Sequence, residues 1–128
     1  MNNSHADFYS KHYISPVSQN ITNLESHFRR RSSLFYSLGI TPLLVSGSEV
    51  IEFGPGSGHN ATYTVSLLPN RYLLVDGNPK GIYDTTKILE RYSSIDIQVI
   101  QSFFIDYKND DKFDIVLAEG CLPHQSEP

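Results

Sequence analysis

Short apolar runs alternate along the chain with longer segments that are apolar at every third or fourth position. Continuous apolar runs are typical of strands buried on both faces of a sheet, whereas the wider spacing predicts amphipathic helices. The runs predict strands at 50–53, 72–75, 97–100 and 113–118. The wider spacing predicts helices at about 22–38, 59–68 and 79–92.

The first predicted helix has recognisable signals at both ends. Thr22 to Glu25 has the form of a capping box, and Gly39 stands where a helix would end. Arg31 interrupts an otherwise apolar face that consists of Leu24, Phe28, Leu34, Phe35 and Leu38. Arg31 also belongs to the basic run 29–31, which we interpret as a solvated helix face.

Strands alternate with helices after residue 46, which predicts an α/β fold with a parallel sheet. Right-handed crossovers place helices on both faces of such a sheet, and we expect the strand order 3-2-1-4. Ligands bind beyond the carboxyl ends of the strands where this order reverses, here at strands 1 and 4. Residues 47–128 form the predicted core. Residues 1–46 hold the first helix and, at 1–20, an aromatic segment that is either a tail or a lid.

The first strand leads into the stretch Glu52-Phe53-Gly54-Pro55-Gly56-Ser57-Gly58. Glycine permits positive φ and close approach of a ligand to bare backbone, and the following helix start offers N–H groups and a positive dipole end. An acid beside such amides suits a ligand that carries both an amine and a carboxylate. His59 occupies the place of the third glycine of the dinucleotide fingerprint, so the spacing differs from that motif. We predict ligand contacts from Glu52, Gly54, Pro55, Gly56 and Gly58.

Asp76 stands at the end of the second predicted strand, 22 positions after Gly54. An acid about 20 residues beyond the first glycine can accept hydrogen bonds from ribose hydroxyls. Asp76-Gly77 is also a good turn pair, and Asn78 precedes a proline as a helix cap does. We favour the ribose role for Asp76 and add Gly77 and Asn78 to the predicted site.

The run from Val50 to His124, somewhat more than half of this chain, resembles the N-terminal half of a class I S-adenosylmethionine-dependent methyltransferase. The stretch Glu52 to Gly58 matches motif I of that family, and 73–76 matches its second strand with the ribose-binding acid. Segments 102–106 and 113–120 match the ends of its third and fourth strands. The resemblance implies a Rossmann-like fold, S-adenosylmethionine as cofactor, and methyl transfer to an acceptor that the sequence does not identify.

The segments after strands 3 and 4 carry the remaining predicted site residues. Many relatives have an adenine-binding acid where this chain has Phe103. We expect adenine to lie against Phe103 or Phe104, with one of the two in the core. Glu119 and His124 follow strand 4, beside the expected methyl position, and are the candidates for a catalytic base. Glu119 is also a candidate cofactor contact through its backbone, and a surface or core position is the alternative for His124.

The family fold continues with three more strands and their helices, whereas this chain stops a few residues after its fourth strand. We expect a fragment of a longer protein. The alternative is a half-fold completed by self-association through the bare edge of strand 4, since an exposed strand edge invites pairing.

Composition limits the other functions. Hydrophobic content of 39% and charged content of 19% fit an ordinary globular protein, and a net charge of −4 does not indicate a nucleic-acid partner. The single cysteine, Cys121, excludes an internal disulfide and favours a reducing compartment. The sequence shows no membrane-spanning run, so we expect a cytoplasmic protein. No histidine has metal-ligand spacing with another histidine or the cysteine, and we predict no metal site.

Three functions stay open at this point. The first is a methyltransferase, or its cofactor-binding part. The second is a module that binds S-adenosylmethionine without turnover. The third is a nicotinamide-dependent oxidoreductase, against which His59 in the place of a fingerprint glycine argues.

Overall fold

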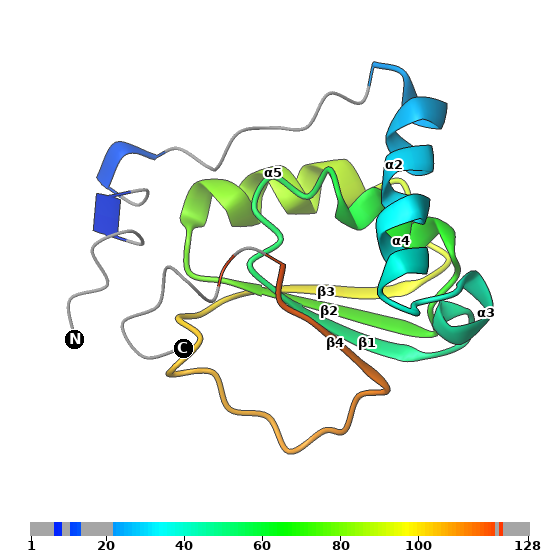
Figure 1. Ribbon diagram of the computed structural model, residues 1–128. Coiled ribbons are helices and arrows are strands. Elements are labelled where there is room, and N and C mark those ends of the chain that lie inside the picture. The colour runs from blue at the N-terminus through cyan, green and yellow to red at the C-terminus, as the bar shows by residue number, and fades with distance from the viewer. Residues whose placement is uncertain (1–6, 9–10, 14–21, 120, 122–128) are drawn as a thin grey trace.

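Four parallel strands form one sheet in the order β3-β2-β1-β4 (Figure 1). The strands are β1 (Glu49–Phe53), β2 (Arg71–Asp76), β3 (Asp96–Gln101) and β4 (Ile115–Leu117). The computed structural model describes residues 7–8, 11–13, 22–119 and 121. The predicted fold class and strand order are confirmed, and the carboxyl ends of β1 and β4 lie next to each other as expected.

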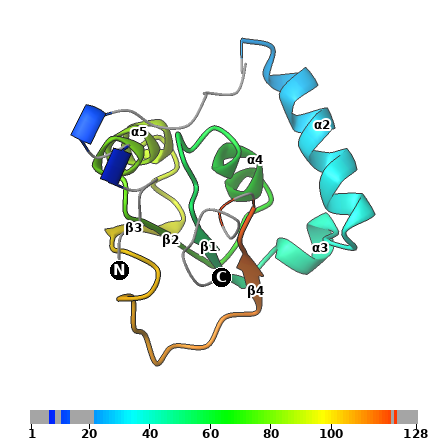
Figure 2. The ribbon, with the colours of Figure 1, turned by 60° about the vertical axis from the view of Figure 1, so that its left-hand side comes forward.

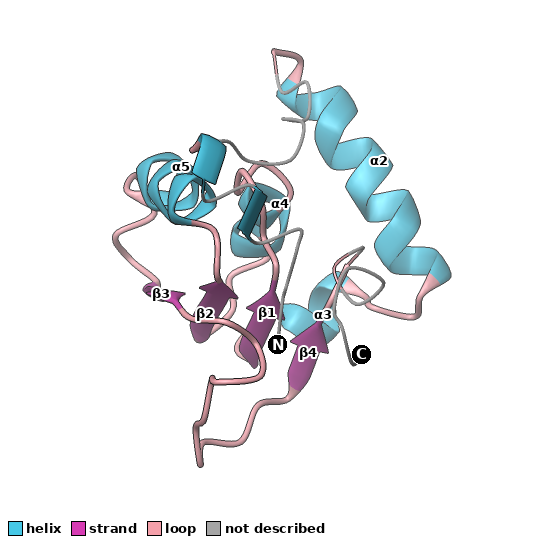
Figure 3. Ribbon diagram, turned by 90° about the vertical axis from the view of Figure 1, so that its left-hand side faces the viewer, coloured by secondary structure: helices cyan, strands magenta, loops and turns pink. Residues whose placement is uncertain are grey.

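The helices of the described chain lie on one side of this sheet (Figure 3). They are α2 (Leu24–Ser37), α3 (Pro42–Val45), α4 (Ala61–Ser66) and α5 (Pro79–Leu89). The other face is crossed by residues 102–114, which connect β3 to β4 without a helix. The prediction of helices on both faces is therefore not met in the described part, because this connection is rich in turn residues and lacks helical periodicity.

Two apolar clusters lie on opposite faces of the sheet. Val50, Tyr72 and Leu74 point toward α4 and α5 and are fully buried there. Ile51, Leu73 and Val75 point the other way, where the partly buried residues Phe53, Ile100, Phe104, Tyr107 and Phe113 cover them. Alternate side chains of β1 and β2 are thus buried on both faces, which explains their continuous apolar runs.

Helix α2 packs against α4 through Phe28 and Phe35 of the predicted face, but its buried residues are shifted from the predicted ones (Figure 2). The buried residues of α2 are His27, Arg31 and Phe35, whereas Leu24 and Leu38 are 43% and 63% exposed. The interpretation of Arg31 as part of a solvated face is wrong for this residue. Its side chain lies over the Phe35 ring, with 5.3 Å between the guanidinium carbon and the ring centroid, while Arg29 and Arg30 are exposed.

The cap of α2 also differs from the prediction. Asn23 is the N-cap, because its side-chain oxygen accepts a hydrogen bond from the N–H of Ser26 at 3.0 Å. The capping box had placed this role on Thr22. Glu25 instead pairs with Arg29 one turn along the helix.

The outer strand β4 pairs with β1 on one side only within the described chain. Val116 of β4 is 63% exposed. Self-association through this edge stays a prediction, as does the division of the chain at residue 46.

Candidate functional site

The glycine-rich turn between β1 and α4 has the backbone that the sequence predicts. Gly54, Gly56 and Gly58 have φ values of +73°, +62° and +80°, a region that side chains disfavour. Their N–H groups, however, all donate within the protein: Gly54 to the Val75 carbonyl, Gly56 to the Asp76 carboxylate and Gly58 to the Pro55 carbonyl, at 2.9, 3.2 and 3.1 Å. These three N–H groups are therefore bonded within the protein, and contact of these glycines with a ligand stays a prediction. Because the turn is hydrogen-bonded internally, a ligand would fit against its backbone surface and not bind its glycine N–H groups.

Neighbouring residues also require two of these glycines. A Cβ atom on Gly54 would lie 2.7 Å from Cβ of Cys121, and one on Gly58 would lie 2.8 Å from Cα of Thr85 on α5. Helix α4 begins only at Ala61, two residues later than predicted, because residues 57–60 continue the turn. The turn is thereby held between the end of β4 and the face of α5.

Asp76 at the end of β2 closes this turn from the other side. One carboxylate oxygen accepts from Gly56 N–H and the other from Asn78 N–H at 2.9 Å. Burial raises the pKa of Asp76, while these backbone N–H groups act in the opposite direction. The carboxylate thus has the turn role that the sequence left open, and contact with ribose stays a prediction.

The predicted adenine end lies beside Asp76. The Phe103 ring rests against Gly77, where an added Cβ would lie 2.9 Å from the ring. Phe103 is 42% exposed, whereas Phe104 packs with Phe53 at 5.5 Å between ring centroids. One phenylalanine therefore belongs to the core, as expected, and the other offers an accessible aromatic ring at the tip of β2.

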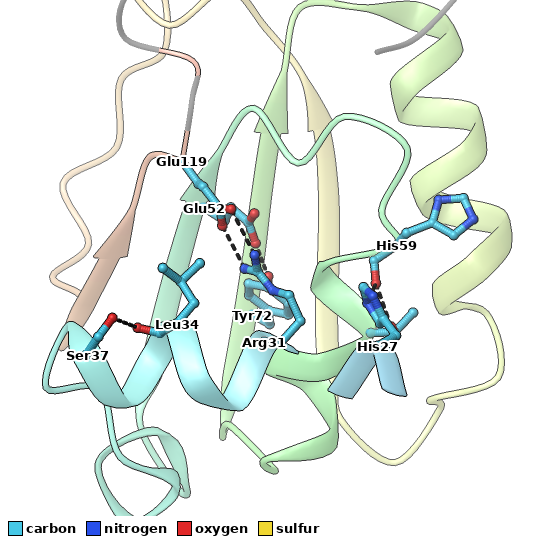
Figure 4. Close-up of polar contacts among 9 residues, drawn as sticks. His27, Arg31, Leu34, Ser37, Glu52, His59, Tyr72 and Glu119 are labelled. Carbon is cyan, nitrogen blue, oxygen red and sulfur yellow. Dashed lines mark hydrogen bonds and ion pairs between the residues drawn. The ribbon is translucent and has the colours of Figure 1, made fainter. Parts of the chain in front are cut away.

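Glu52 is 5% exposed and points toward α2, on the same face as Tyr72 (Figure 4). The Tyr72 hydroxyl donates a hydrogen bond to its carboxylate. Burial raises the pKa of Glu52 to about 7, opposed by the Tyr72 hydrogen bond and by the positive charge of Arg31. A carboxyl group that titrates near neutral pH thus lies at the strand end, directly before the glycine turn.

Arg31 and Glu119 join α2 to the end of β4 across this site (Figure 4). The guanidinium donates two hydrogen bonds to the Glu119 carboxylate, at 2.8 and 2.6 Å. The Arg31 side chain is 9% exposed and that of Glu119 is 48% exposed. Within the described residues, Nε of Arg31 is buried without a hydrogen-bond partner. Glu119 is therefore engaged by a cation in this state, which limits its use as a base.

A second contact joins α2 to the glycine turn. His27 is 1% exposed, and its Nε2 donates to the backbone carbonyl of His59 at 3.0 Å (Figure 4). Nδ1 of His59 hydrogen-bonds the Ser57 hydroxyl at 2.6 Å. Burial lowers the pKa of both histidines. Sequence reasoning missed His27, although its spacing of four from Arg31 and of eight from Phe35 marks a single helix face.

Other predicted residues are placed as follows. The Cys121 thiol donates to the Phe53 carbonyl at 3.2 Å, and burial raises its pKa. Pro55 is buried within the turn, and Asn78 caps α5 by accepting from Lys80 N–H at 3.0 Å. His124 lies outside the described residues. Among the residues that the structure describes, no group of three metal-ligating side chains is gathered, and no helix is both long and apolar enough to cross a membrane.

A groove of about 420 Å³ lies beside the turn. It is lined by Ser57, His59, Lys80, Asp84, Lys87 and Ile88. The side chains therefore leave open space along the side of the turn that faces α5.

Comparison with known proteins gives structural matches only. No protein-family model and no curated protein matches this sequence. The PRMT1 enzyme–prozyme complex of Trypanosoma brucei with AdoHcy matches 75% of this chain and 30% of its own, at 20% identity and a TM-score of 0.59. A SAM-dependent methyltransferase from Thiobacillus denitrificans in complex with S-adenosyl-L-homocysteine matches 69% of this chain and 36% of its own, at 19% identity and a TM-score of 0.56. EvdMO1 matches 100% of this chain and 31% of its own, at 15% identity and a TM-score of 0.66.

The chain thus spans about a third of the length of these three proteins. At these identities the likeness establishes the fold. It is a Rossmann-like fold with four parallel strands, similar to that of the matched methyltransferases.

Proposed function

We propose that this chain is the S-adenosylmethionine-binding part of a methyltransferase. The observation that carries the proposal is the turn Glu52 to Gly58, with three glycines at positive φ between a buried strand and a helix. It stands at the end of β1 in a sheet of order β3-β2-β1-β4, where such folds bind their ligands. The matched structures with S-adenosylhomocysteine support the proposal through their shared fold.

The residues present fit such a cofactor in three places. Glu52 supplies a carboxyl group for the ammonium of the methionine part. Asp76, Gly77 and Asn78 form the tip of β2, where the ribose hydroxyls would be bound. The accessible ring of Phe103 would stack on adenine. Gly77 allows this ring to rest directly on the backbone.

The cofactor, when bound, supplies the sulfonium leaving group and the methyl group. The chain's own contribution is to orient it. Alignment of two reacting groups can supply up to roughly 7–11 kcal/mol, so no covalent nucleophile from the protein is required. Glu119 becomes available as a base only if its pair with Arg31 opens. The acceptor is unidentified, and the cytoplasm is proposed as the site of action because the one cysteine favours a reducing compartment.

Calorimetric titration with S-adenosylmethionine, S-adenosylhomocysteine and NAD tests the proposal. We expect the first two to bind and NAD not to bind. Binding should be lost in Glu52→Ala with Gly56→Val, and kept in the matched double variant Glu49→Ala with Gly47→Val. The control changes the same residue types at the opposite end of β1, and Gly47 has a φ of +74°. Circular dichroism verifies folding of each variant. If the double variant does not fold, Glu52→Gln replaces it and should weaken binding without abolishing it.

The outcomes separate the three functions. Unchanged affinity in a folded Glu52 and Gly56 variant would refute the assignment of the turn. Binding of S-adenosylmethionine without methylation of any acceptor would favour the non-catalytic module. Binding of NAD alone would favour the oxidoreductase.

A further inference from the structure

Packing alone does not explain the hydroxyl group of Tyr72. Tyr72 is fully buried in the apolar cluster below α4 and α5, and a phenylalanine ring would fill the same space. A buried hydroxyl is costly unless it is hydrogen-bonded. Here it donates to Glu52, and Thr64 of α4 hydrogen-bonds the same hydroxyl. Tyr72 therefore fixes the orientation of the one carboxyl group that the proposed function places at the cofactor's ammonium.

The charges around Glu52 come from every element packed against it. Arg31 faces it from α2, Glu119 from the end of β4, and Asp76 from the end of β2. Cys121 lies close enough for its own pKa to be raised by Glu52. The Arg31 charge is already compensated by the bidentate contact with Glu119. With Glu52 neutral, the Arg31–Glu119 pair is balanced and Asp76 is the remaining acid. An ionised Glu52 adds a further negative charge, which an incoming ammonium would balance.

We propose that Tyr72 is a positioning residue which holds Glu52 for the cofactor's ammonium group, and that ammonium binding displaces a proton from Glu52 to solvent. This inference rests on the proposed function. In the step, the O–H bond of the Glu52 carboxyl group breaks and its proton leaves to water. The carboxylate then pairs with the ammonium group, and nothing is oxidised or reduced. The raised pKa of Glu52, caused mainly by burial, agrees with a proton being present before binding.

The experiment is calorimetric titration with S-adenosylhomocysteine in two buffers of different ionisation enthalpy, between pH 6 and 7.5. The difference between the buffers counts the protons released. With a Glu52 pKa of about 7, release should amount to most of one proton at pH 6 and about a quarter at pH 7.5. Glu52→Gln should abolish this component. Subtracting its profile from that of the wild type also removes any titration of the ligand itself.

Two further variants examine the role of Tyr72. Tyr72→Phe removes a hydrogen bond that favours the ionised carboxyl group, so the release profile should move to higher pH and affinity at pH 7 should fall about 2- to 12-fold. Tyr63→Phe is the matched control, because Tyr63 is also buried but packs between Phe28 and Phe35 of α2. It should change neither quantity. 5′-Methylthioadenosine lacks the amino-acid group and should bind without proton release to every variant.

Each outcome decides a separate question. No binding of S-adenosylhomocysteine or S-adenosylmethionine overturns the proposed function and this inference with it. Binding without buffer-dependent heat in the wild type overturns this inference alone, as does an identical release profile in Tyr72→Phe. If Tyr72→Phe does not fold, Thr64→Val takes its place. The Thr64 hydrogen bond lowers the pKa of Tyr72, so its loss leaves the Tyr72 hydroxyl a weaker donor to Glu52 and should shift the profile in the same direction, by a smaller amount.

Discussion

Gly58 to alanine is the substitution whose cost the structure defines best. Gly58 has a φ of +80°, and a Cβ there would lie 2.8 Å from both Cα of Thr85 and Cγ2 of Ile88 on α5. Thr85 Cα is a backbone atom and cannot move without displacing the helix. The left-handed backbone alone costs a non-glycine residue about 1–2 kcal/mol. Overpacking adds about 1–3 kcal/mol, so Gly58→Ala should lose about 2–5 kcal/mol.

Gly47→Ala provides the matched control. Gly47 has nearly the same φ, +74°, but nothing lies within 4 Å of its added Cβ. It should lose only the conformational part, about 1–2 kcal/mol. Urea unfolding followed by circular dichroism measures both values. In thermal unfolding, each kcal/mol corresponds to roughly 4 °C for a chain of this size.

The comparison of these two variants is decisive for the packing of the turn. If Gly58→Ala loses no more unfolding free energy than Gly47→Ala, the turn and α5 are not in tight contact. Close approach of a ligand would then be the explanation for glycine at position 58. If the extra cost is present, Gly58 is required by packing whether or not a ligand binds. The glycine motif then has a structural component that sequence comparison alone cannot separate from function.

Three further predictions concern the polar contacts behind the site. Glu119→Gln should destabilise the fold by about 1–3 kcal/mol in urea unfolding, because it leaves the buried Arg31 charge uncompensated. Arg31→Met should cost less, because it leaves only a half-exposed carboxylate. A larger loss of stability in Arg31→Met than in Glu119→Gln would refute this prediction. Glu52 has a folded pKa of about 7 against 4.5 when unfolded, so between these values the folded state holds a proton that the unfolded state has lost, and stability falls as pH rises from 4.5 to 7. Glu52→Gln should therefore gain about 3 kcal/mol of stability at pH 8.5 and little at pH 4.5. Equal gains at both pH values would contradict this prediction. His27 has a lowered pKa in the folded state, so the unfolded state binds more protons below pH 6.5, and stability should fall as the pH decreases below that value. His27→Gln should reduce this dependence of the thermal unfolding temperature on pH. His12→Gln, at an exposed position, is the control and should not reduce it.

The sequence by itself determined the sheet. The strands at 50–53 and 72–75 have apolar residues on both faces, so both faces must be buried, and the helix between them requires parallel pairing. The glycines at positive φ were also foreseeable, because no other residue adopts that backbone as readily. These features follow from local periodicity and conformational preference, which a single sequence contains.

Only the tertiary structure decided what the polar residues contact. In the sequence, Arg31 resembles a surface residue because of its basic run, and Tyr72 resembles an ordinary apolar strand residue. In the fold, both side chains face Glu52, which brings α2, β2 and β1 together. The amides of Gly54, Gly56 and Gly58 are occupied by partners up to 21 positions away in the chain. Burial, pKa and hydrogen bonding depend on such distant neighbours, and the chain brings them together only when it folds.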